Sequence, residues 1–131
     1  MKFATYMRAA LAGACMISAS AVFAAATDYA FEAVKADIAN GKASELAVRL
    51  VHKQTGKPVA GAIIFRSRLD MSPDGMGDMT ASLQALPSNE AGVYRFKADL
   101  TMAGQWALKV MAKVPGEAET VQGSVVFDAK D

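Results

Sequence analysis

Residues 92–111, GVYRFKADLTMAGQWALKVM, contain the strongest fold signal in the chain. In residues 94–98 apolar side chains alternate with charged ones, and the alternation returns in residues 106–110, after the small turn residues 102–104. A repeat of two places successive side chains on opposite faces of a β-strand. The stretch therefore predicts two strands joined by a short turn, each with one buried face. The expected buried side chains are Tyr94, Phe96, Ala98, Trp106, Leu108 and Val110.

The chain on either side of this stretch shows the same short alternating runs, separated by Gly, Pro and Asn. Residues 70–78 are expected to form a loop, and Ile63, Phe65 and Leu69 are expected on the inner side of the strand before it. About seven short strands with frequent turns and no amphipathic helix favour an antiparallel β-sandwich of immunoglobulin-like type. Strands are predicted at residues 28–37 (where a helix is the alternative), 45–50, 62–69, 80–86, 93–99, 106–111 and 120–128.

Length and charge limit the possible functions. The chain has 131 residues, which is room for one domain. Without Lys2 and Arg8, which belong to the leader described next, residues 27–131 carry twelve basic and thirteen acidic side chains. This balance lacks the basic stripe that a phosphate backbone requires, so nucleic acid is not an expected partner. A large cofactor-binding enzyme is excluded by size.

Residues 1–26 are typical of a secretory signal peptide. Lys2 and Arg8 precede an uncharged run of small and apolar residues, whose final alanines allow cleavage after Ala24 or Ala26. A basic start, an apolar middle and a small-x-small end are the three parts of such a leader. We therefore expect residues 27–131 to form one exported domain in the periplasm.

Two alternatives for the leader stay open. Its uncharged run is about the minimum length that spans a membrane, so it could be retained as an anchor. Cys15 could carry a lipid, although a lipobox needs a branched apolar residue where this chain has Ala12. If the leader is cleaved, the domain has no cysteine, which excludes a disulfide scaffold, a thiolate nucleophile and a zinc–cysteine site.

The sequence contains no recognisable catalytic constellation. His52 is the single histidine, and the sequence has no recognisable nucleophile motif that it could activate as a general base. We expect it to be a solvated surface residue at a strand end, and we expect the protein not to be an enzyme.

Methionines gather in the predicted loop. Met71, Met76 and Met79 lie within nine residues, and Met102 lies in the turn before Trp106; these four are called the methionine set below. A thioether is a soft, neutral ligand that suits Cu(I) or Ag(I) in an oxidising compartment. If both loops share one end of the sandwich, the four sulfurs would form a metal site, with the Trp106 ring over the bound cation.

Two other interpretations of this loop remain. Methionine also fills gaps in cores, and Met71 and Met79 flank predicted strands where they would pack inward. Asp70, Asp74 and Asp78 suggest Ca²⁺, but they lack the alternating ligands and final glutamate of a calcium loop.

Three segments resemble the YtkA-like/FixH-like family of small exported bacterial β-sandwich domains: residues 68–76, 92–108 and 114–117. The resemblance covers roughly Val48 to Phe127. It implies periplasmic copper or silver handling, beside heavy-metal efflux pumps or in copper-oxidase assembly. Met71, Met76 and Met102 match methionines of the family, and Met79 is added from the spacing. The alanine-rich leader differs from the strong membrane anchor of FixH itself.

Two functional hypotheses follow. In the first, a periplasmic accessory protein, at most peripheral to the membrane, binds Cu(I) or Ag(I) through the methionine set and passes it to a heavy-metal efflux system or a copper-oxidase assembly component. In the second, a metal-free adaptor uses the same loop and the region of Tyr94 and Trp106 to bind a membrane pump or oxidase subunit.

Overall fold

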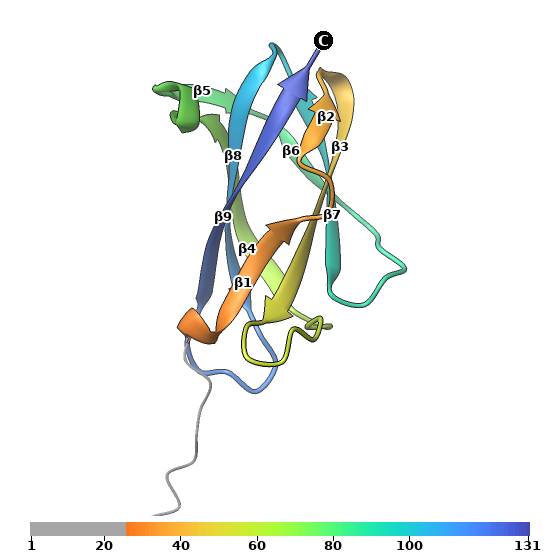
Figure 1. Cartoon of the computed structure of the whole chain (residues 1–131), viewed down its shortest axis with the longest axis vertical. Coiled ribbons are helices and arrows are strands. Elements are labelled where there is room, and N and C mark those ends of the chain that lie inside the picture. The colour runs from red at the N-terminus through yellow and green to blue at the C-terminus, as the bar shows by residue number, and fades with distance from the viewer. Residues whose placement is uncertain (1–25) are drawn as a thin grey trace, which may run out of the picture.

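A computed structural model describes residues 26–131. Over these residues the chain forms nine β-strands and two short 3-10 helices (Figure 1). The predicted all-β sandwich is confirmed, with two strands more than expected. The bounds are η1 Ala26–Asp28, β1 Tyr29–Ala33, β2 Asp37–Ala39, β3 Gly41–His52, β4 Ile63–Met71, η2 Ser72–Asp74, β5 Met76–Ala81, β6 Leu83–Leu86, β7 Val93–Leu100, β8 Gly104–Lys113 and β9 Val121–Lys130.

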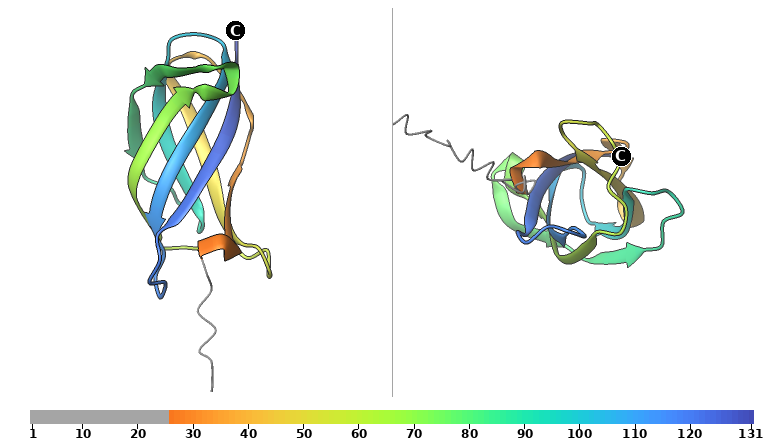
Figure 2. Two further views of the ribbon diagram at one scale, coloured as in Figure 1. Left: turned by 90° about the vertical axis from the view of Figure 1, so that its left-hand side faces the viewer. Right: turned by 90° about the horizontal axis from the view of Figure 1, so that it is seen from below.

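The strands form two sheets that face each other, as the view from below in Figure 2 shows. One sheet has the order β1-β3-β7-β6 and the other has the order β2-β9-β8-β4-β5. Neighbouring strands are antiparallel, except for the parallel pair β2 and β9. η2, β5 and the β7–β8 turn lie at the top of Figure 1, which we call the η2 end. η1 and the β8–β9 connection lie at the opposite end.

The core is built from the alternating side chains that the sequence pattern predicted. Leu46, Val48 and Leu50 of β3 are fully buried, and so are Trp106 and Leu108 of β8. Each fully buried large apolar side chain contributes about 1.5–3 kcal/mol. Apart from Leu50, which belongs to a smaller cluster with Val114 and Val121, these side chains share one cluster with Leu69, Met71, Phe96, Ala98, Val110, Val125 and Phe127.

The prediction that Ile63 and Phe65 face the core at the start of β4 is wrong. Ile63 and Phe65 are 66% and 50% exposed. The register between β4 and β8 shifts between Ile64 and Arg66, which places an extra residue in β4. Such a bulge reverses the in–out alternation on one of its sides, so Ile64 packs against the core instead. Leu69, which lies after the bulge, is buried as predicted.

Residues 80–86 do not form the single strand that the pattern predicts. β5 ends at Ala81 and pairs with β4, whereas β6 begins at Leu83 and pairs with β7 in the other sheet. The predicted loop over residues 70–78 is also shorter, because β4 continues to Met71 and β5 begins at Met76.

The N-terminal strand predicted for residues 28–37 is divided between the sheets. β1 pairs with β3, and β2 pairs with β9. The signal peptide of residues 1–26 and the lipid attachment at Cys15 fall outside the described residues, apart from Ala26 in η1. Among residues 26–131 there is no helix long and apolar enough to cross a bilayer.

Candidate metal centre

The methionine set is spread over the η2 end of the sandwich. Met71 is the last residue of β4, Met76 and Met79 lie on β5, and Met102 lies on the turn between β7 and β8. Figure 1 shows β5 and this turn at the same end. The condition that both loops share one end is therefore met.

A single 3-10 turn, η2, connects the two strands that carry three of these methionines. Pro73 suits this turn because its ring fixes φ. Gly75 ends the turn with a φ of 73°, in the left-handed region, and its N–H donates to the Ser72 carbonyl at 2.9 Å. β5 then returns beside β4 with Met76 opposite Met71.

Irregular pairing on β5 brings two thioethers to the surface. Asp70 pairs with Thr80, but the next β4 residue, Met71, pairs with Met76. A regular ladder would instead place Met79 opposite Met71. Met76 and Met79 are each 38% exposed, on or beside this irregular segment.

Met71 is a core residue, as the packing interpretation expected. It is fully buried and belongs to the main hydrophobic cluster. A Cβ atom added to Gly104 would stand 2.5 Å from Met71 Cε and 2.7 Å from Asp74 Oδ2. The Met71 sulfur is therefore not presented to solvent, whereas Met102 is 38% exposed.

The close approach at Gly104 predicts that Gly104→Ala lowers the free energy of unfolding by about 1–3 kcal/mol. The added methyl group would meet the buried end of Met71 and the Asp74 carboxylate, at a φ of 139° that strains any side chain. Urea unfolding measures the loss. Gly41→Ala is the matched control, because Gly41 has a φ of 137° and nothing within 4 Å of the added Cβ. Equal losses in the two variants would contradict the contact.

Asp74 and Trp106 fix the β7–β8 turn against η2. The Asp74 Oδ2 atom accepts a hydrogen bond from the Gln105 N–H at 2.9 Å. The Trp106 Nε1–H donates to the Met102 carbonyl at 3.2 Å. Trp106 is fully buried, so the expectation that its ring covers an exposed cation is wrong.

Asp70 is a charged residue inside the structure. It is 1% exposed, and its Oδ2 atom accepts hydrogen bonds from Arg68 Nε at 2.9 Å and Lys109 Nζ at 3.1 Å. Its Oδ1 atom accepts from the Ser72 N–H at 3.0 Å. Burial alone would raise the pKa of Asp70, but the hydrogen bonds from Ser72, Arg68 and Lys109 outweigh it and hold the pKa well below its usual range.

Sequence reasoning missed this ion-pair cluster. The signal was the pair Arg68 and Asp70, two residues apart on one strand and therefore on one face. The third member, Lys109, is brought opposite Arg68 only by the β4–β8 register.

For the Ca²⁺ interpretation, no three His, Cys, Asp or Glu side chains of residues 26–131 lie together in a way that could hold a metal ion.

His52 is not the solvated residue that the sequence suggested. It is half-buried, with its Nδ1 atom buried and without a hydrogen-bond partner. Its ring meets the Tyr29 ring edge-on, with centroids 5.3 Å apart. The Tyr29 hydroxyl donates to Glu117 Oε1 at 2.9 Å, and burial together with this bond raises the pKa of Tyr29.

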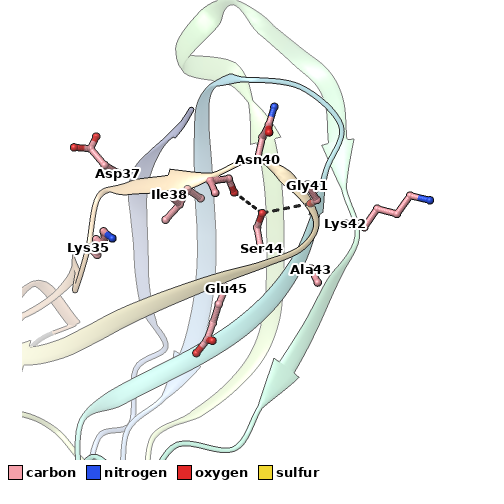
Figure 3. Close-up of a pocket in the computed structure, with 10 residues that line it drawn as sticks. Lys35, Asp37, Ile38, Asn40, Gly41, Lys42, Ala43, Ser44 and Glu45 are labelled. Carbon is pink, nitrogen blue, oxygen red and sulfur yellow. Dashed lines mark hydrogen bonds between the residues drawn. The ribbon is translucent and has the colours of Figure 1, made fainter. Parts of the chain in front are cut away.

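A hollow of about 490 Å³ lies between β2 and β3 (Figure 3). The Ser44 hydroxyl donates to the Ala39 carbonyl at 2.5 Å at its inner side. Lys35 and Lys42 point to opposite sides in Figure 3, so its charged groups do not converge on one ligand. No methionine lines this hollow.

The described residues thus form a small β-sandwich domain with its methionine set at one end. A family model described as YtkA-like matches residues 23–111, more than half of the chain, and the chain belongs to this family. The FixH-like part of the resemblance stays a prediction. No curated protein matches. Among solved structures, the chain is similar to the adhesin InvE of Yersinia pseudotuberculosis, with 17% identity and a TM-score of 0.47 over 80% of this chain and 27% of that chain.

Proposed function

We propose that this protein is a periplasmic accessory protein that binds Cu(I) or Ag(I) at the η2 end and passes the ion to a heavy-metal efflux system or a copper-oxidase assembly component. The observation that carries the proposal is the exposure of Met76 and Met79 on β5 and of Met102 on the β7–β8 turn, at one end of the sandwich. Membership of the YtkA-like family is consistent with a small accessory protein. The proposal includes no catalytic step.

The chemistry of these side chains suits delivery. Thioethers are neutral and do not titrate, so they hold a soft cation over a wide pH range. An ion held by these three partly exposed methionine side chains would be accessible to the ligands of an acceptor. Met71 lies in the core and would have to leave it to become a fourth ligand, so we assign it a supporting role.

An anaerobic Cu(I) titration of residues 27–131 against a chromophoric chelator tests the proposal. The wild type should withdraw one equivalent of Cu(I) from the chelator. The variant Met76→Leu/Met102→Leu should bind at least about tenfold more weakly, a change of about 1.4 kcal/mol. Leucine keeps the size and apolar character of the side chain, so the fold should be retained.

Met111→Leu is the control, because Met111 lies on β8 opposite Arg66 rather than at the η2 end. It should leave Cu(I) affinity unchanged. Unchanged affinity in the Met76→Leu/Met102→Leu variant would refute the site, and no competition by the wild type would refute metal binding as the function.

The second candidate is the metal-free adaptor, which the full burial of Met71 favours because it removes one expected ligand. Exposed methionines make adaptable protein contacts. Trp106 does not belong to such a surface, since it is buried. The Tyr94 hydroxyl is also engaged, donating to the Val59 carbonyl at 2.8 Å and accepting from the Ala62 N–H at 3.0 Å. The adaptor predicts no Cu(I) competition, and loss of binding to a pump or oxidase subunit in the Met76→Leu/Met102→Leu variant.

A further inference from the structure

The outer face of the five-stranded sheet carries an excess of positive charge near its centre. Side chains that point outward from neighbouring antiparallel strands form rows across a sheet. Two adjacent rows cross β4, β8 and β9 here, and they are Arg66–Met111–Gln122 and Arg68–Lys109–Ser124.

These six side chains surround a hollow of about 420 Å³, called the outer hollow below. Its floor includes Val110 and Gly123, which contribute backbone because Val110 points into the core and Gly123 has no side chain. A Cβ atom at Gly123 would stand 2.4 Å from Phe31 Cδ2, so glycine is required there. Long basic side chains therefore border a shallow floor of strand backbone.

The charge of the outer hollow is not balanced. Arg68 and Lys109 share one carboxylate, that of the buried Asp70. Among the described residues, Arg66 has no ion-pair partner. Three cations thus face one anion. The outer face of the other sheet differs, since Arg95 pairs there with Glu45.

Asp70 also holds two of these cations in place. Arg68 and Lys109 are both bound to its Oδ2 atom, yet each side chain remains roughly half exposed. Arg68 Nη2 also donates to the Gly77 carbonyl at 2.9 Å. The remaining N–H groups of Arg68 and Lys109 stay available to another acceptor. Fixing the two side chains before binding reduces the entropy cost of recognition.

We infer that the outer hollow is a docking site for an acidic, extended segment of a partner protein. Charge complementarity selects the carboxylates, which would bind Arg66 and the outward side of Lys109. Met111 offers an apolar contact between them, and Gln122 and Ser124 offer donors and acceptors for peptide groups. Arg68 links this site to β5 through its hydrogen bond to the Gly77 carbonyl, but none of Met76, Met79 and Met102 lines the hollow. Peptide binding at Arg66 can therefore be tested separately from metal binding.

NMR titration of ¹⁵N-labelled residues 27–131 tests this site, with an end-blocked octapeptide of alternating Glu and Val as the probe. At low ionic strength, shift changes should map to Arg66, Arg68, Lys109, Met111 and their β9 neighbours. The Arg66→Glu variant should bind at least about tenfold more weakly, because attraction becomes repulsion. A peptide with Lys in place of Glu should not bind.

Lys42→Glu is the matched control, because it makes the same charge change on an exposed β3 side chain of the other sheet (Figure 3). It should weaken binding less than about twofold, since Lys42 lies far outside the contact and salt screens the residual charge effect. Equal weakening in both variants, shift changes on the other sheet, or no peptide binding at low ionic strength would each overturn the inference. Binding to phosphatidylglycerol vesicles without binding to the peptide would also overturn it, and would assign this face to a membrane surface.

Discussion

Asp70→Ala should lower the free energy of unfolding by about 1–3 kcal/mol at neutral pH, because the donors that bind this buried carboxylate lose their acceptor while Arg68 and Lys109 remain half exposed. The substitution removes two charge-assisted hydrogen bonds, from Arg68 and Lys109, and leaves the Ser72 N–H without its acceptor. Urea unfolding followed by the fluorescence of Trp106, the single tryptophan, measures the loss.

The pH dependence of stability has a definite sign. The pKa of Asp70 is lower in the folded state than in the unfolded chain, so the folded state releases this proton more readily. Its stabilisation is fully present above the unfolded carboxyl pKa of about 3.9, and it is lost as the pH falls from there toward the folded pKa. The wild type should therefore lose more stability between pH 5 and about pH 2 than Asp70→Ala does.

Asp37→Ala is the control for the same charge change at the surface. Asp37 is 66% exposed and forms an ion pair with Lys130 at 3.5 Å. Surface pairs of this kind contribute about 0–1 kcal/mol. If Asp70→Ala were no more costly than Asp37→Ala, the buried cluster would not be a source of stability.

Met71→Ala should lower the free energy of unfolding by about 2–5 kcal/mol, because truncating a fully buried methionine removes apolar contacts and leaves a cavity. Met71→Leu should cost less than about 1.5 kcal/mol, since it nearly conserves volume. Met76→Ala is the exposed control and should stay within about 0.5 kcal/mol of the wild type. Thermal and urea unfolding give these values.

The same variants separate packing from ligation. Met71→Leu should keep Cu(I) affinity, because the sulfur of Met71 is enclosed in the core. A stable Met71→Leu protein with tenfold weaker Cu(I) binding would show that Met71 leaves the core to bind the ion, and the supporting role assigned to it would be wrong.

Much of the fold follows from local alternation. Runs such as Leu46–Leu50 and Trp106–Val110 bury one face in both the sequence prediction and the structure. Alternation fails at the start of β4, because the extra residue between Ile64 and Arg66 exchanges the inward and outward faces of the strand. It also cannot show that the chain passes from one sheet to the other between Ala81 and Leu83, since that depends on pairing with strands distant in sequence.

The candidate site was predictable in composition but not in geometry. The closely spaced methionines marked this segment as a candidate site. Pro73 and Gly75 showed that the segment contains a turn, because this signal does not depend on the rest of the fold. The burial of Met71 depends on the facing β8 strand and its approach to Gly104, which no local pattern encodes. The Asp70 cluster and the outer hollow depend on the register of β4 with β8, which the sequence does not show. The nearly balanced overall charge gave no sign of them either.

The length of β3 sets how far the exposed thioethers stand from the point where the chain enters the domain. β3 has twelve residues and runs from the η2 end to the end that carries η1 (Figure 1). At about 3.3 Å per residue it spans roughly 40 Å. If the leader is retained as an anchor, the proposed Cu(I) site would therefore lie at the end of the domain remote from the membrane. If the leader is cleaved, the proposed metal carrier would instead diffuse freely between a donor of the ion and its acceptor.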